Sequence, residues 1–374
     1  MQRRGVLALL SVALVATSLN AQQAPADAPY QVLKRAKVGG EGGSDYIFAD
    51  VEGRRLYIPR GGTRAVPATD TSAARPAVPG RITVFDLESL APVGEIPGTG
   101  GNGVAIDPKS GHGFSSSKPV SMFDTKTLKL IRTIDVGAAQ PDGILFDSYN
   151  DRIYVFSHPT KDAIVINSRD GKVLGTIDLG GVPEQGVADG HGTLYVVMQD
   201  AEGSVTKVDV NTMTVTAHYT FGDKGGGCNG LALDDRTHVL FAACARSGAA
   251  TTQPPMPQMV ILSADDGQIL ATLPLAGSSD GAAFNPATNE AFSTHSNGTM
   301  TVVKELTSGT FGVSQNLNTM LGARTLSLDP KTGRIYAMSV ERAPVPPGTP
   351  AGPGGRPPVG PVIPGSFTVL VIGR

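Results

Sequence analysis

The sequence predicts an all-β protein built from seven copies of one four-stranded unit. Residues 142–180 show the unit most clearly, because short runs of β-branched and aromatic residues alternate there with turns rich in Asp, Asn and Gly, as in an antiparallel meander. The composition agrees, since 47 Gly, 28 Pro and no Trp favour many turns over long helices. An aromatic residue also recurs in the second strand of each unit, at Tyr57, Phe114, Tyr154, Tyr195, Phe241, Phe292 and Tyr336.

These aromatic residues are 40 to 57 residues apart, and a polar turn precedes each one. A period of about 40–50 residues with four strands per unit is typical of β-propeller blades. We therefore predict a single seven-bladed β-propeller of four-stranded antiparallel blades over residues 31–374, after a short linker at 22–30. The last unit lacks a fourth strand before Arg374, whereas residues 31–38 read as an extended segment without a partner. We expect this N-terminal strand to close the last blade and to cover its exposed edge.

Three units are longer than the others, and each time the extra residues fall between the second and third strands. These insertions, at 59–80, 246–258 and 343–365, are rich in Pro, Gly, Ala and Thr, so we expect irregular loops. Such loops leave a blade on the side where its first strand begins, so all three should gather on one rim of the central channel. Because function concentrates on loops held by a rigid scaffold, this rim is the predicted binding face.

The first residues predict export. Arg3 and Arg4 precede an apolar run over 6–15, and small and polar residues follow up to Ala21, which is the order of a signal peptide; the run is too short to span a bilayer. We expect removal of residues 1–21 and a periplasmic or extracellular monomer without a membrane span, whether export uses the Sec or the twin-arginine route. Losing both arginines takes the net charge from −2 to −4, which lacks the basic character of nucleic-acid binding.

Segments such as DRIYVFS and DPKTGRIYAMS resemble the YVTN-type β-propeller repeat family over residues 31–374. This resemblance implies a secreted or periplasmic propeller of mostly undefined activity, and its motif describes blade geometry without catalytic residues. The pairs Asn229-Gly230 and Asp280-Gly281 are similar to blade-entry motifs of gluconolactonase-like propellers. That similarity implies a metal held by Asn, Asp and Glu residues that polarises a lactone. Those relatives have six blades, however, and Asp45 replaces the expected glutamate.

A polar residue stands near the start of the first strand in each unit, where it should ring one mouth of the channel. Two interpretations are open. Asp or Asn before Gly makes a tight turn whose side chain bonds local backbone, or converging carboxylate and amide oxygens hold a polar ligand or a cation, for which Ca²⁺ is the natural choice. The expected Ca²⁺ ligands are Asn102, Asp142, Asn229 and Asp280. The candidates for the rim as a whole are Asp45, Asn102, Asp142, Gln185, Asn229, Asp280, His295 and Arg324.

Two histidines follow second-strand aromatic residues. His295 lies three residues after Phe292, at a position that should be close to the channel mouth. His158 lies four residues after Tyr154, so strand alternation predicts that it faces the opposite side unless a bulge intervenes. We therefore expect the two histidines to share no metal site, and each to be a loop-end residue and not a ligand.

Cys228 and Cys244 are the only cysteines, and the turn between their strands centres near Arg236. This spacing places them opposite each other, and an even count in an exported protein predicts a disulfide. The alternative, a pair of thiolate metal ligands, would need further soft ligands nearby.

The sequence therefore predicts an exported binding or scaffold protein that acts through the channel-mouth rim. The repeats account for nearly every residue, and no catalytic constellation stands outside them, so we do not expect an enzyme. Two alternatives remain: a Ca²⁺-dependent lactonase-type hydrolase using the Asp/Asn ring, and a docking subunit of a periplasmic assembly. An apolar surface on the long loops would favour docking, and a polar funnel with a bound ion would favour the enzyme.

Overall fold

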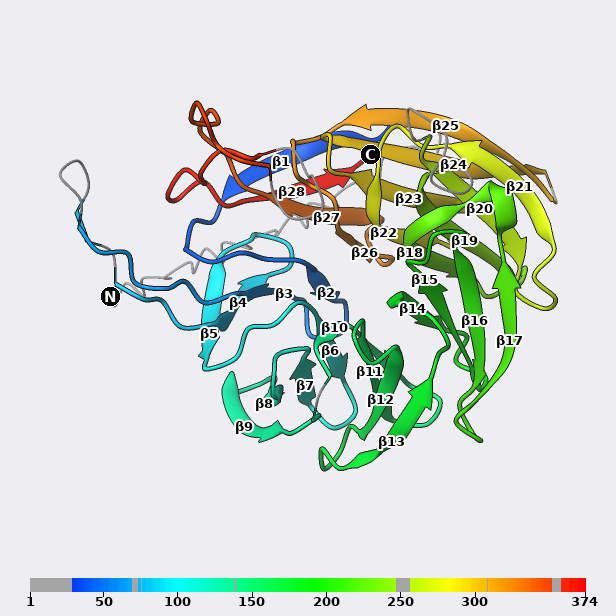
Figure 1. Cartoon of the computed structure of the whole chain (residues 1–374), viewed down its shortest axis with the longest axis horizontal. Helices are drawn as coiled ribbons and strands as arrows, with labels where there is room; N and C mark the ends of the chain where they lie inside the picture. Colours follow the sequence, from blue (N-terminus) through cyan, green and yellow to red (C-terminus); the bar gives the residue numbers. More distant parts are fainter. Residues whose placement is uncertain are drawn as a thin grey trace, which may run out of the picture.

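The computed structural model describes residues 29–68, 73–74, 76–137, 139–246, 256–307, 309–351 and 358–374. These residues form seven four-stranded antiparallel sheets arranged in a ring (Figure 1), which confirms the predicted seven-bladed β-propeller. The predicted signal peptide at 1–21 lies outside the described residues. In the described part, one short 3-10 helix, η1 (Gly222–Lys224), occurs, and no helix is long and apolar enough to cross a bilayer.

Blades 1 to 6 each contain four strands that follow one another in the chain, with the first strand nearest the centre of the ring. Blades 1 and 2 contain β2 (Phe48–Asp50), β3 (Arg55–Arg60), β4 (Arg81–Asp86), β5 (Pro92–Pro97), β6 (Val104–Asp107), β7 (His112–Ser115), β8 (Val120–Asp124) and β9 (Lys129–Ile134). Blades 3 and 4 contain β10 (Pro141–Asp147), β11 (Arg152–Ser157), β12 (Asp162–Asn167), β13 (Val173–Asp178), β14 (Pro183–Ala188), β15 (Thr193–Met198), β16 (Ser204–Asp209) and β17 (Thr214–Thr220). Blades 5 and 6 contain β18 (Gly226–Asp234), β19 (Val239–Arg246), β20 (Gln258–Ser263), β21 (Ile269–Pro274), β22 (Ser279–Asn285), β23 (Glu290–His295), β24 (Thr299–Thr307) and β25 (Thr310–Asn318).

Blade 7 is completed by the N-terminal strand, as predicted. Its strands are β26 (Leu326–Asp329), β27 (Arg334–Ser339), β28 (Thr368–Gly373) and β1 (Gln31–Lys37). β1 pairs with β28 in antiparallel register, from Gln31 opposite Gly373 to Lys37 opposite Thr368, and Figure 1 shows the two strands, blue and red, side by side. Backbone groups of β1 therefore pair with the outer edge of β28, and this pairing closes the ring.

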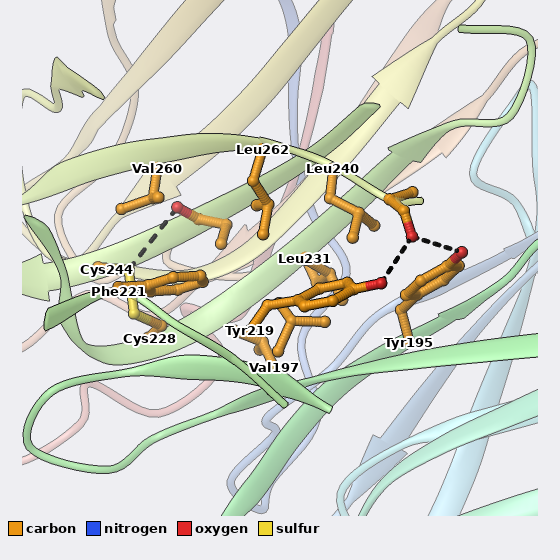
Figure 2. Packing of buried hydrophobic residues seen from close by; sticks show 13 residues of the cluster. Tyr195, Val197, Tyr219, Phe221, Cys228, Leu231, Leu240, Cys244, Val260 and Leu262 are labelled. Carbon is orange, nitrogen blue, oxygen red and sulfur yellow. Dashed lines mark hydrogen bonds between the residues drawn. A yellow bond between two sulfur atoms is a disulfide. The ribbon is translucent and has the colours of Figure 1, made fainter. Parts of the chain in front are cut away.

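The recurring aromatic residues are buried between blades. Tyr195 packs in a cluster with Phe221, Leu231 and Leu240 (Figure 2). Its hydroxyl donates to the carbonyl oxygen of Ala264 in the next blade at 3.1 Å, so the ring is buried while its polar end keeps a partner. The periodic aromatic position thus provides the core between blades, and at Tyr195 and Tyr336 it also provides a hydrogen bond to the next blade.

The predicted disulfide is confirmed. Cys228 on β18 lies directly opposite Cys244 on β19, and the two sulfur atoms are bonded. Both residues are buried in the cluster drawn in Figure 2. The disulfide therefore links the first two strands of blade 5.

Candidate functional site

Polar side chains at the starts of the innermost strands converge at one mouth of the channel. Each of these residues lies at or just before the first strand of its blade, and most of their hydrogen bonds reach another blade. They are Asp45, Asn102, Asp142, Glu184, Asn229, Asp280 and Arg324. We call this set the mouth network. The hydrogen bonds and ion pairs of the mouth network join different blades. An Asp or Asn side chain that caps its own turn would instead bond backbone groups of the same blade.

One half of the mouth network is organised by an arginine. Arg324 donates through Nη2 to Oδ1 of Asp45 and places Nη1 next to Oδ2 of Asp280, both at 2.8 Å. Asn229 donates to the other oxygen of Asp280 at 2.7 Å. The guanidinium group thereby links blades 6, 7 and 1, and Asn229 adds blade 5 through Asp280.

The other half is organised by carboxylates. Asn102 donates through Nδ2 to Oδ1 of Asp142 at 2.7 Å, and Tyr46 donates its hydroxyl to Oε2 of Glu184 at 3.1 Å. Gln199 donates to Oε1 of Glu184 at 2.6 Å and lies 3.4 Å from Oδ1 of Asn229. Gln199 therefore joins this half to the arginine-organised half.

Glu184 occupies in blade 4 the place that the sequence analysis gave to Gln185. Pro183 pairs with Met198 just as Pro141 pairs with Ser157, so Glu184 is the register equivalent of Asp142. Gln185 crosses the channel instead, where its Oε1 accepts from the backbone N–H groups of Leu231 and Ala282. The turn of blade 4 is one residue shorter than the turn of blade 3, and Gln185 would be the equivalent position only if two residues were missing.

His158 also differs from expectation, because it faces the channel mouth. Strand β11 ends at Ser157, so strand alternation no longer fixes the direction of the next side chain. The Nε2 atom of His158 lies 2.9 Å from Oδ2 of Asp142 and 3.5 Å from Oε1 of Glu184. Gln199 directly follows β15, just as His158 directly follows β11. The two side chains therefore come from equivalent positions in neighbouring blades.

His295 lies apart from the mouth network contacts. It ends β23 opposite Ser279, is 0% exposed, and its Nε2 lies 3.0 Å from Oγ1 of Thr301. Since Thr301 donates its own proton to Asn316, the Thr301 oxygen must accept from His295 Nε2–H, which leaves Nδ1 as a bare nitrogen. The expectation that the two histidines share no site is consistent with these contacts.

Burial and charge determine the electrostatics of the mouth. Burial raises the pKa of Asp45 to about 6, and burial also raises the pKa of Glu184. Burial acts against the charge of Arg324, but the carboxylates of Asp280 and Asp45 outweigh it and raise the pKa of Arg324. Contact with Asp142 and then Glu184 raises the pKa of His158 to about 10. The carboxylates at the mouth therefore stabilise the positively charged forms of Arg324 and His158.

A cleft of about 960 Å³ adjoins the mouth. Asp45 and Arg324 belong to both the mouth network and the cleft wall. The rest of the wall comes mostly from the segments 40–44, 320–325, 338–342 and 359–367, with Arg60, Thr63 and Ser296. Two of the three long loops contribute to it, since Thr63 comes from the first loop and Val362 from the third. Residues 247–255 of the middle loop lie outside the described residues.

The cleft wall also contains exposed apolar side chains. Leu321 is 71% exposed and Val359 is 67% exposed, and Val362 and Ile363 lie beside them in the same wall. A cleft of this size suits a small ligand or a short peptide segment. Its polar part at Arg324 and its apolar part at the third loop give it two different recognition surfaces.

Two sets of residues could hold a metal ion. The predicted Ca²⁺ ligands form two hydrogen-bonded pairs, Asn102 with Asp142 and Asn229 with Asp280, and Arg324 neutralises the second pair. The second set is Asp142, His158 and Glu184, whose ligand atoms all lie within 4.8 Å of one another. The sequence predicts that His158 faces away from the mouth and names Gln185 in place of Glu184, so it does not place these three residues together.

Comparison with known protein families and with curated protein sequences gives no match. Solved structures do resemble the chain in fold. One is hydrazine synthase of Kuenenia stuttgartiensis, with 15% identity, a TM-score of 0.63, and coverage of 78% of this chain and 91% of that chain. Another is the WD40 repeat structure of RRP9, with 12% identity, a TM-score of 0.66, and coverage of 94% and 99%.

A third similar structure is a chain of the mitotic checkpoint complex, with 10% identity, a TM-score of 0.65, and coverage of 90% and 96%. At these identities the likeness establishes the β-propeller fold alone. It gives no residue of the mouth network a function.

Proposed function

We propose that this protein is a binding propeller that docks a segment of a partner protein in the cleft beside the channel mouth. The observation that supports this is the composition of the cleft wall, in which exposed Leu321 and Val359 lie on the same surface as the Asp45–Arg324 ion pair. Exposed apolar side chains rimmed by charged groups are characteristic of protein-binding sites. The fold is consistent with this role, since a similar propeller is a component of the mitotic checkpoint complex.

Panning a random peptide library on the purified protein tests the proposal. Peptides that bind the wild type should bind much more weakly to Leu321→Arg and Val359→Arg variants, because each new cation replaces an apolar contact. The matched control is Leu130→Arg, which changes an exposed leucine on the outer strand β9 and should leave binding unchanged. If no peptide is enriched, or if all three variants bind the enriched peptides equally, the cleft is not the docking site.

We also propose that the protein acts outside the cytoplasm. The Cys228–Cys244 disulfide and the signal-like pattern of residues 1–21 support this, because disulfides persist in oxidising compartments. Fractionation of cells that express the full chain, with N-terminal sequencing of the product, tests it. A product that keeps Arg3 and Arg4 and stays with the cytoplasmic fraction would contradict export.

A second candidate function is metal-dependent hydrolysis of a lactone or similar ester. The specific observation in its favour is His158 between Asp142 and Glu184, because a divalent ion held there could polarise a carbonyl or activate water. Small lactones should then be hydrolysed by the metal-loaded protein and not by a His158→Gln variant, as followed by proton release. This candidate depends on the ion site argued next, whereas the docking proposal does not.

A further inference from the structure

The side chains of Asp142, His158 and Glu184 come together from three separate segments of blades 3 and 4. Asp142 lies in β10, His158 directly follows β11, and Glu184 lies in β14. Nε2 of the histidine lies between the two carboxylates, at 2.9 Å and 3.5 Å. From this geometry we propose that the three residues form a binding site for one divalent transition-metal ion of the Zn²⁺ type, with one nitrogen and two oxygen ligands.

The carboxylates are oriented as ligands would be. Both accept from neighbours outside the triad: Asp142 accepts from Asn102 through Oδ1, and Glu184 accepts from Tyr46 through Oε2 and from Gln199 through Oε1. Each also turns an oxygen toward Nε2 of His158. Hydrogen-bond partners of a metal-coordinating carboxylate fix its orientation, and this strengthens metal binding.

The burial of Glu184 is an independent reason to expect a cation. Its side chain is only 6% exposed, and a carboxylate removed from water is costly unless a positive charge compensates it. Arg324 contacts Asp45 and Asp280 and does not supply that charge. Nε2 of His158 lies 3.5 Å from Oε1 of Glu184, so an ion bound between these two atoms would supply the compensating charge.

The spacing of the three ligand atoms fits a small ion. Bonds of about 2.0–2.2 Å in a tetrahedral site place neighbouring ligand atoms about 3.4 Å apart, close to the two distances at His158. Binding would release the proton from Nε2, so that the nitrogen lone pair can form the metal bond. Since the side chain of His158 is 33% exposed, the fourth position would face the channel mouth and could take water or a ligand.

The donor atoms also indicate the class of metal. One imidazole nitrogen with two carboxylate oxygens suits Zn²⁺, Mn²⁺ or Co²⁺, whereas Ca²⁺ takes six to eight oxygen ligands. This site therefore differs from the Asp/Asn ring in both its residues and its ion. The two share only Asp142.

Titration of the chelator-stripped full chain with Zn²⁺ in a calorimeter, and with Co²⁺ in a visible spectrometer, tests the inference. We expect one ion per chain, with visible Co²⁺ bands typical of low coordination number. Glu184→Gln and His158→Gln should weaken binding more than about 100-fold, and Tyr46→Phe, which loosens Glu184 only, should weaken it roughly tenfold.

Asp280→Asn is the matched control, because Asp280 is the register equivalent of Asp142 in blade 6 and is paired with Arg324. This variant should lose far less affinity than Glu184→Gln and His158→Gln, because Asp280 contributes no ligand atom to the triad. Absence of a stoichiometric ion would overturn the inference, as would an equal loss in Asp280→Asn and His158→Gln. Preferential binding of Ca²⁺ that depends on Asp280 would also overturn it, in favour of the ring site.

Melting curves of each variant without metal show whether it is folded, and the isosteric Glu184→Gln exchange keeps the shape of the site. The Leu321→Arg cleft variant should bind metal as the wild type does. Loss of the ion site and loss of peptide docking can therefore be told apart.

Discussion

The hydroxyl of Tyr46 donates a hydrogen bond of 3.1 Å to Oε2 of Glu184, which ties blade 1 to blade 4 across the channel mouth. The two residues are 138 positions apart in the chain. Because Glu184 is buried, its carboxylate depends on such donors in place of water. Side chains of blades 1 and 4 therefore meet across the channel mouth.

Replacing Tyr46 with Phe should lower the free energy of unfolding by about 1–2 kcal/mol, because the buried carboxylate loses a donor. Urea denaturation at neutral pH measures this. The exposed Tyr149 offers a matched Tyr→Phe control that should change stability little. Equal stability of Tyr46→Phe and wild type would mean that water replaces the hydroxyl without cost.

Asp45 should make stability fall as the pH rises. Its pKa is raised from 3.8 to about 6 by burial, so the folded protein binds this proton more tightly than the unfolded chain does. Asp45 therefore destabilises the fold progressively from pH 4 to above pH 6, by an amount on the order of 1–3 kcal/mol. Asp45→Asn should be more stable relative to wild type at pH 7 than at pH 4, as measured by urea denaturation at both values.

Asp223→Asn serves as the control for this experiment, because Asp223 is exposed. Its effect on stability should not change between pH 4 and pH 7. A pH-independent difference between Asp45→Asn and wild type would refute the raised pKa.

His295 should have the opposite effect. Burial lowers its pKa from 6.5 to about 4, and protonation would place an N–H at Nδ1, which has no hydrogen-bond partner. Its neutral form therefore supports the fold fully above pH 6.5, and up to about 3 kcal/mol is lost as the pH falls through 4.

A His295→Gln variant keeps an N–H donor for Thr301 but does not titrate. Relative to wild type, it should gain stability between pH 6.5 and pH 4 in denaturant titrations. The exposed His191 provides a His→Gln control without this gain. If both variants follow the wild-type pH profile, the ring of His295 titrates normally.

The disulfide should contribute about 3 kcal/mol to the free energy of unfolding, as expected for the short loop it closes, because Cys228 and Cys244 have a sequence separation of 16. The double variant Cys228→Ala/Cys244→Ala should show this loss in denaturation experiments. A reducing agent should lower the stability of the wild type and leave the variant unchanged. Identical stability of variant and wild type would contradict a structural role.

The repeat made the fold predictable from sequence. Aromatic residues such as Tyr154 and Tyr336 recur with the period of a blade, and each is buried as that pattern requires. The disulfide was predictable for the same reason, because β18 and β19 form a hairpin whose register follows from its turn. Regular strand pairing therefore determines both features.

The site was predictable only in part. The mouth network residues Asp142 and Asp280 follow from their place in the repeat, but Glu184 was missed because the turn before Tyr195 is shorter than in other blades. The pairs Pro141-Asp142 and Pro183-Glu184 were the available signal. His158 and Gln199 lie just past strand ends, where alternation no longer fixes side-chain direction, so their contacts depend on three-dimensional loop geometry.

The pairing of β1 with β28 also sets an order of events during folding. The first strand of the ring to be synthesised finds its partner only when the last strand in the chain has been made. Contacts between such distant segments form late, because a long loop must close before they can form. Blades 1 to 6 can assemble as the chain emerges, while β1 stays unpaired until β28 arrives. Pairing of β1 with β28 is thus the final step, and the completed ring depends on both strands.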